Sequence, residues 1–156
     1  MSDVVLARIS AAPLDVAAHL DAVSHPAAGA VASFIGQVRD HDPAVDGTVA
    51  RLEYEAHPDA EPRLAELARS VAGERPVRVA ATHRVGTLFV GEIAVVVAVA
   101  SAHRSVALDV CRELIETIKT DLPVWKRQVD DQGRGTWTGI ADQPPANGGS
   151  TSTSSA

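Results

Sequence analysis

Residues 93–121 read IAVVVAVASAHRSVALDVCRELIETIKTD, an apolar run, a short polar link and an amphipathic segment. Residues 93–100 contain no polar side chain, which is typical of a central strand covered on both faces. Residues 106–121 place apolar side chains three and four positions apart, and this spacing predicts the longest helix of the chain. A buried strand followed by a long helix is therefore the expected centre of the fold.

Shorter elements are expected on either side of this centre. Strands are predicted at residues 4–9, 29–38, 49–56 and 77–84, a hairpin at 124–138, and helices at 13–23 and 58–72. Strands and helices mix without a strict βαβ rhythm, so the predicted class is α+β, with a mixed or antiparallel sheet and packed helices. Residues 1–142 should form one domain. Residues 143–156 have a composition that cannot bury a core and predict a disordered tail.

The composition limits the possible functions. The chain has 156 residues, 46% of them hydrophobic, and a net charge of −6, which argues against a general nucleic-acid binder or an anionic-membrane protein. Its one cysteine, Cys111, falls on the apolar side of the long helix and is interpreted as a core residue. The histidines lack metal-ligand spacing, and the N-terminus does not read as a signal peptide. We therefore expect a cytoplasmic protein without a metal site.

The basic residues are unevenly divided between two types. Twelve of the 14 are arginines, and the two lysines, Lys119 and Lys126, are seven positions apart. A partly buried ammonium can lose its proton and act as a base or nucleophile, whereas a guanidinium stays charged. Pro123 ends the helix that carries Lys119 and can turn Lys126 back toward it. The pair predicts amine chemistry; a helix-terminal cation and an exposed edge-strand lysine are the alternative interpretations.

Further basic residues lie at positions that often bind ligands. His103 and Arg104 precede the long helix, whose free N–H groups suit a phosphate or carboxylate, with Ser101 or Ser105 as the expected cap. Arg39 ends a strand at a polar loop. These residues suggest a basic pocket for a small, multiply anionic ligand, although solvated charges are the alternative. The candidate pocket comprises Arg39, His103, Arg104, Lys119, Lys126 and Arg127.

Five stretches together resemble the large, catalytic subunit of molybdopterin synthase. They are residues 34–39 (FIGQVR), 52–55 (LEYE), 83–86 (HRVG), 101–105 (SAHRS) and 119–127, where Lys119 precedes Pro-Val-Trp-Lys-Arg. They occur in the family's order and spacing and cover residues 30–137. The most specific feature is the combination of Ser-Ala-His-Arg with two lysines separated by six residues, the second of which follows Pro-x-Trp.

The resemblance implies an α/β-hammerhead-like fold and a sulfurtransferase of molybdenum cofactor biosynthesis. Enzymes of this family convert cyclic pyranopterin monophosphate into molybdopterin, with sulfur from the thiocarboxylated C-terminal Gly-Gly of a ubiquitin-like small subunit. Two large subunits form a homodimer within a heterotetramer, and no metal or bound cofactor is required. The resemblance makes Lys119 the main catalytic group, assisted by Lys126. The substrate-binding residues that it implies are Gln37, Val38, Arg39, His103, Arg104, Arg127 and Gln128, with His103 and Arg104 able to act across the dimer interface.

The chain departs from the family pattern in one place. A basic residue is expected shortly after the final tryptophan, but Trp137 is followed by Thr-Gly-Ile-Ala, and Arg134 is the candidate substitute. The alternative function is a non-catalytic module that binds a phosphorylated small molecule or a ubiquitin-like partner. Such a module needs the basic pocket but not the amines, so a Lys119→Arg variant distinguishes the two.

Overall fold

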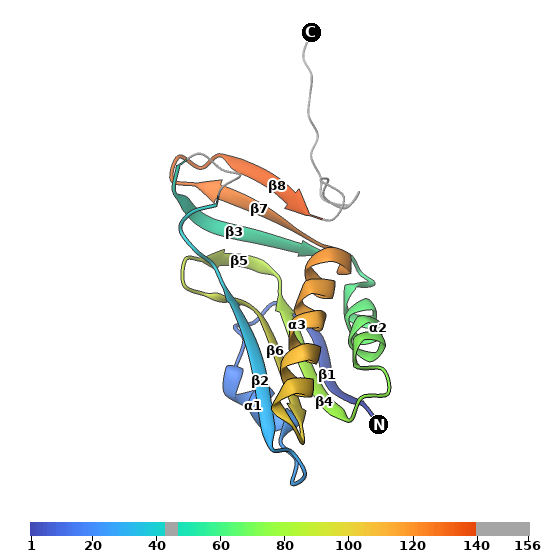
Figure 1. Ribbon diagram of the computed structural model, residues 1–156. Helices are drawn as coiled ribbons and strands as arrows, with labels where there is room; N and C mark the ends of the chain where they lie inside the picture. Colours follow the sequence, from blue (N-terminus) through green and yellow to red (C-terminus); the bar gives the residue numbers. More distant parts are fainter. Residues whose placement is uncertain (43–46, 140–156) are drawn as a thin grey trace.

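The apolar strand and the long helix form the centre of the structure, a computed structural model that describes residues 1–42 and 47–139. Strand β6 (Ile93–Ser101) pairs on both sides, and its side chains from Ala94 to Ala100 are buried. Helix α3 (Arg104–Asp121) begins shortly afterwards and packs back along β6, so the helix ends beside the start of the strand (Figure 1). The predicted central strand and helix are confirmed.

The first sheet has the strand order β1-β4-β6-β2. Strands β1 and β4 are parallel and the other two pairs are antiparallel, so the sheet is mixed. Helices α2 and α3 cover one face, and helix α1 covers the other. Strand β2 is left at the edge of the sheet. The remaining elements of this layer are β1 (Asp3–Ser10), α1 (Val16–Val23), β2 (Ala30–Gln37), α2 (Ala60–Ala72) and β4 (Val77–Arg84).

The second sheet is antiparallel throughout, with the order β5-β3-β7-β8. Figure 1 shows that it lies across the end of the molecule at which α3 terminates. An apolar cluster that includes Val38, Leu88 and Ala94 joins strands of the two sheets. The strands of this second sheet are β3 (Val49–Ala56), β5 (Gly86–Phe89), β7 (Val124–Asp130) and β8 (Gly135–Gly139).

The structure confirms the α+β class and corrects two local predictions. Residues 86–89 form strand β5, which the sequence did not predict, because so short a strand with one buried side chain, Leu88, leaves little periodic signal. Helix α1 begins at Val16 rather than Pro13, since the Asp15 carboxylate caps it by accepting the Ala18 N–H.

The prediction that a serine caps α3 is wrong. The N-cap residue is His103, which makes no side-chain cap hydrogen bond. Ser101 still belongs to β6, and its hydroxyl donates to the Pro76 carbonyl at 3.3 Å. Ser105 lies inside the first turn, beyond the cap position.

The tail predicted at residues 143–156 and the domain limit at residue 142 lie outside the described residues. Within residues 1–42 and 47–139, every helix is too short or too polar to cross a membrane.

Candidate active site

The two lysines meet where α3 ends and β7 begins. Lys119 lies in the last turn of α3, and Lys126 is the third residue of β7. The N–H of Leu122 bonds to the Ile118 carbonyl at 3.1 Å, and Pro123 prevents the helix from continuing. The chain therefore turns back, and the ammonium of Lys126 comes close enough to act on the charge of Lys119.

The surroundings of Lys119 make it a weaker base than a free lysine. Burial of the ammonium lowers its pKa, and the nearby charge of Lys126 lowers it further. The residue as a whole is exposed. Protein atoms therefore displace water around the amine while a ligand can still reach it. Glu116, whose carboxylate could have opposed this change, is not among the groups that shift the pKa. An accessible amine that loses its proton readily suits general-base or nucleophilic chemistry.

Two buried rings lie next to the lysines. The Tyr54 ring meets the His83 ring edge-on, with centroids 5.1 Å apart and planes at 71°. Tyr54 is directly opposite Lys126 in the β3–β7 register, so their side chains share one face of the second sheet. His83 lies in β4 near the end of α3, and the charge of Lys119 acts on its imidazole.

Both rings are neutral near pH 7. Burial lowers the pKa of His83 to about 4, against the opposing effect of its hydrogen bond to the Arg84 carbonyl. Because a carbonyl only accepts, His83 Nδ1 donates in that 2.7 Å bond, and the neutral ring carries its proton there. Burial raises the pKa of Tyr54 to about 12. The walls beside the two amines therefore carry no charge of their own.

A carboxylate reaches the site from the loop after β2. Asp42 Oδ2 lies 3.8 Å from Lys126 Nζ and accepts a hydrogen bond from Gln128 Nε2 at 3.0 Å. Lys126 and Gln128 are two positions apart on β7, so both point to the same face of the sheet. Gln128 is only 2% exposed. Its amide nitrogen is therefore committed to Asp42.

Residues 37–39 bring the end of β2 to the same region. Gln37 and Arg39 are exposed, whereas Val38 between them is 3% exposed and packs into the apolar cluster between the sheets. The Val38 N–H bonds to the Glu92 carbonyl at 3.0 Å, and its own carbonyl accepts the Gly91 N–H at 2.8 Å. Val38 thus fixes the strand end, and the exposed guanidinium of Arg39 follows it.

Arg127 points to the opposite face of the second sheet. It is adjacent to Lys126 in β7, and successive strand residues alternate between faces. Its guanidinium lies 3.2 Å from Glu53, which also pairs with Arg51 at 3.4 Å. Within one chain, the structure therefore does not bring Arg127 together with the lysines.

His103 and Arg104 lie at the other end of the molecule. They are sixteen and fifteen positions before Lys119, respectively, so the helix separates them from it by about 22 Å or more. Both residues are exposed. The basic pocket suggested by the sequence is thus divided, with Arg39, Lys119 and Lys126 at one end of α3 and His103 and Arg104 at the other.

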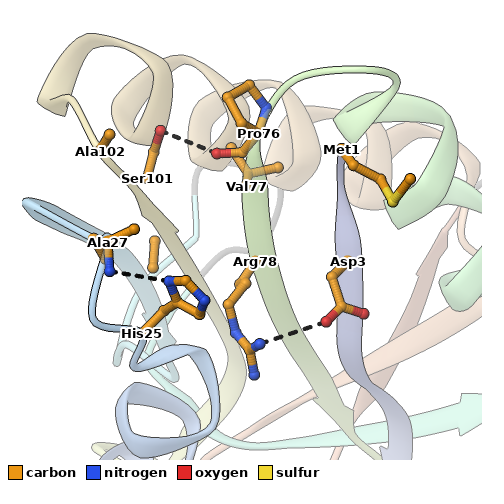
Figure 2. Close-up of a pocket in the computed structure, with 11 residues that line it drawn as sticks. Met1, Asp3, His25, Ala27, Pro76, Val77, Arg78, Ser101 and Ala102 are labelled. Carbon is orange, nitrogen blue, oxygen red and sulfur yellow. Dashed lines mark hydrogen bonds and ion pairs between the residues drawn. The ribbon is translucent and has the colours of Figure 1, made fainter.

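A pocket of about 290 Å³ also lies at the His103 end of the molecule, next to Ser101 and Ala102. Figure 2 shows Arg78 of β4 reaching across to Asp3 of β1, an ion pair of 3.5 Å. None of the candidate site residues lines this pocket. It is therefore separate from the two lysines.

Other residues singled out in the sequence have structural roles. Cys111 is 6% exposed, and burial raises the pKa of its thiol, which confirms it as a core residue. Arg134 pairs with Asp130 at 2.8 Å through its Nε. In the two described segments, 1–42 and 47–139, no group of three or more His, Cys, Asp or Glu side chains could hold a metal ion.

Three neighbours of the lysines were not predicted from the sequence. Tyr54 and His83 lie inside two of the stretches that carry the family resemblance, and that position was a signal for them. His83 also donates a hydrogen bond to the Arg84 carbonyl, and this structural role is compatible with a place beside Lys119. Asp42 stands in a loop of turn formers and carries no comparable signal, because its contact with Lys126 spans 84 positions of the chain.

Comparison with known proteins identifies the family of this chain. The family model described as MoaE protein matches residues 9–121. The molybdopterin synthase catalytic subunit 1 of Mycobacterium tuberculosis is 39% identical over 142 residues, which cover 88% of this chain and 91% of the relative. The molybdopterin synthase catalytic subunit of Thermoplasma volcanium is 39% identical over 127 residues, which cover 80% and 89%.

A solved structure shows the same fold. The crystal structure of molybdopterin synthase from Staphylococcus aureus superposes with a TM-score of 0.79 at 32% identity, over 85% of this chain and 96% of that one. The family match, the identity over most of the chain and the shared fold lead to one conclusion: this chain belongs to the MoaE family.

Proposed function

We propose that this chain is the catalytic subunit of a molybdopterin synthase. It converts cyclic pyranopterin monophosphate into molybdopterin, and a ubiquitin-like small subunit supplies sulfur from its thiocarboxylated C-terminal Gly-Gly. The observation that carries the proposal is the pairing of the only two lysines, with the pKa of Lys119 lowered by burial and by Lys126. The one cysteine is buried in the core, which fits a reaction whose sulfur arrives on a partner.

The two amines have complementary tasks. Attack of the thiocarboxylate on the pterin side chain and opening of the cyclic phosphate both require proton transfers. Lys119, with its lowered pKa, is the main catalytic group and exchanges protons with the reacting atoms. Lys126 assists by stabilising the anionic intermediates. The uncharged rings of Tyr54 and His83 support this role, because they neither neutralise nor repel an anionic substrate.

A homodimer completes the phosphate-binding part of the site. Strand β2 lies at the edge of the first sheet and exposes Val31, Phe34 and Ile35 by 49%, 36% and 40%. Two copies related by a two-fold axis can pair these edges only antiparallel. The start of β2 in one copy then faces the end of β2 in the other.

This pairing would unite the two halves of the basic pocket. The start of β2 is hydrogen bonded beside Ser101, close to His103 and Arg104, and its end leads to Arg39. The eight residues of β2 span about 24 Å, close to the length of α3 between its two basic ends. Antiparallel pairing therefore brings His103 and Arg104 of one copy toward Arg39 and Lys119 of the other. Together these residues would bind the phosphate and the pterin.

The remaining parts of the proposal follow from the family and the composition. Gln37 would line the pocket, Val38 and Gln128 would support it, and Arg127 would act from its outer side. The reaction needs no metal and no bound cofactor. We place the protein in the cytoplasm, where the single buried cysteine would stay reduced.

A single-turnover assay tests the proposal. The full chain is mixed with a thiocarboxylated small subunit and cyclic pyranopterin monophosphate, and dithiolene product is measured. Wild type should form product, and Lys119→Ala should be slower by about a thousandfold, within the range for loss of a general acid–base group. Lys119→Arg should bind substrate like wild type. Its turnover should be nearly as slow as that of Lys119→Ala, because a guanidinium does not give up its proton.

Other results would change the function. If wild type binds the small subunit and the pterin but forms no product, the protein is the non-catalytic module. If Lys119→Arg retains full turnover, the site needs only a fixed cation at this position, and amine chemistry at Lys119 is wrong.

A further inference from the structure

We propose that Asp42 is a positioning residue for Lys126: its carboxylate, held by the Gln128 amide, fixes the Lys126 ammonium beside Lys119. The inference rests on the proposed function for its catalytic consequence, but the geometry is independent of it. Asp42 belongs to none of the stretches that carry the family resemblance, and it acts through Lys126.

Two contacts of Asp42 link three side chains. Gln128 Nε2 donates to Asp42 Oδ2 at 3.0 Å, and the same oxygen lies 3.8 Å from Lys126 Nζ. Gln128 is 2% exposed, so its amide is fixed by packing. The side chain of Asp42 is 18% exposed and that of Lys126 is 34% exposed. A buried amide therefore helps to place the carboxylate, and the carboxylate restrains a more exposed ammonium.

The position of Lys126 matters because its charge acts on Lys119. A lysine side chain has four rotatable bonds, and without a partner its ammonium samples a wide space. Asp42 draws that ammonium to one place and offsets part of its positive charge. Removing the carboxylate charge would leave Lys126 uncompensated and less ordered, and its repulsion of a proton on Lys119 would increase.

The groups around the two amines allow the sign of this effect to be stated. They come from four elements besides the loop that carries Asp42: Lys119 from α3, Lys126 from β7, Tyr54 from β3 and His83 from β4. Tyr54 and His83 are neutral near pH 7. Among these groups, Asp42 therefore supplies the negative charge, and its loss should lower the pKa of Lys119 further.

Substitutions at Asp42 separate charge from hydrogen bonding. Asp42→Asn keeps an oxygen that can accept from Gln128 but removes the charge, so a purely structural role would survive it. Asp42→Glu keeps the charge, and its longer side chain can still reach across the 3.8 Å gap to Lys126. Asp40→Asn is the matched control, because the Asp40 carboxylate pairs with the adjacent His41.

The first measurement is the single-turnover rate in the holoenzyme with its small subunit. Asp42→Asn should slow the reaction by about tenfold to a hundredfold, the effect typical of groups that orient a functional side chain, with substrate affinity unchanged. Asp42→Glu should restore most of the rate, and Asp40→Asn should match wild type. In a Lys126→Ala background, Asp42→Asn should not lower the rate further, because that background lacks the side chain through which Asp42 acts.

The second measurement does not depend on activity. Reductive methylation with ¹³C-formaldehyde labels only Lys119, Lys126 and the α-amino group, since the chain has no other amines. The NMR titration midpoint of Lys119 should move to lower pH in Asp42→Asn and to higher pH in Lys126→Gln. The Lys126 methyl signals should also change in Asp42→Asn, and both signals should be unaffected in Asp40→Asn.

The two measurements distinguish a failure of the proposed function from a failure of the role proposed for Asp42. An inactive wild type whose Lys119 and Lys126 signals respond as expected would contradict the proposed function but support the role of Asp42. An active wild type in which Asp42→Asn leaves rate and signals unchanged would overturn the role of Asp42. Equal slowing by Asp42→Asn with and without Lys126 would also overturn it, because Asp42 would then act by another route.

Discussion

The two ends of helix α3 differ in how complete their surroundings are. At the C-terminal end, Lys119 lies near residues of β3, β4 and β7, and burial together with the charge of Lys126 lowers its pKa. At the N-terminal end, His103 makes no side-chain cap bond, and both it and Arg104 are exposed. One chain therefore builds the amine part of the candidate site by itself, and it displays on its surface the residues that are proposed to bind phosphate. The strongest test of this difference is to place the two intact ends on separate chains.

Mixing two inactive variants should restore activity. A Lys119→Ala chain retains the N-terminal end of α3, and an Arg104→Ala chain retains the C-terminal end. When both are co-expressed, about a quarter of wild-type activity should return, because random pairing makes half of the dimers mixed and each mixed dimer has one intact site of two. Activity that stays at the level of the single variants would show that both ends act within one chain. A chain carrying both substitutions, paired with wild type, is the control for subunit exchange.

The pH dependence of stability should report the burial of His83 near the C-terminal end of α3. The pKa of folded His83 is about 4, below its ordinary 6.5, so between these values the unfolded chain binds a proton that the folded one excludes. Stability is therefore lost as the pH falls from 6.5 toward 4, by about 3 kcal/mol for this group. Urea unfolding at several pH values should show this loss in wild type.

A His83→Asn variant provides the test of that assignment. Its amide can still donate to the Arg84 carbonyl, as His83 Nδ1 does, but it does not titrate. The variant should lose less stability than wild type between pH 6.5 and 4. An unchanged pH dependence would mean that other groups cause the loss of stability, and that His83 is not a buried neutral ring beside Lys119.

The smallest effect is expected on the face of the second sheet that points away from the lysines, here called the outer face. Glu53 and Arg127 form a 3.2 Å ion pair, with side chains 27% and 36% exposed. Because water screens such a pair, Glu53→Gln should cost less than about 1 kcal/mol of unfolding free energy. Thermal unfolding measures this directly. A cost of several kcal/mol would mean that the outer face is as tightly organised as the face with the lysines.

Local patterns predicted most elements of the fold. The apolar run at β6 and the helical periodicity of α3 were sufficient, because burial on both faces and a repeating apolar stripe leave a direct trace in the sequence. Strand β5 was missed, since four residues with one buried side chain carry almost no period. The cap of α3 was also wrong, because Ser101 found its hydrogen-bond partner in Pro76, 25 positions away.

The candidate site was predictable in part for the same reason. Lys119 and Lys126 are close in sequence, and Pro123 between them signals the turn that unites them. The contact of Lys126 with Asp42 and the ring contact between Tyr54 and His83 each join distant strands or loops. No local pattern encodes such pairs, because they depend on how the two sheets pack.

The sequence by itself determined the α+β class, the central strand and helix, and the two amines, because hydrophobic period and residue type are local properties. The surroundings of those two amines depend on the tertiary structure. Burial and the Lys126 charge lower the pKa of Lys119, Asp42 reaches Lys126 from a distant loop, and α3 holds His103 and Arg104 about 22 Å away. Electrostatic environment and distance arise from packing across the chain, and so they appear only when the chain is folded.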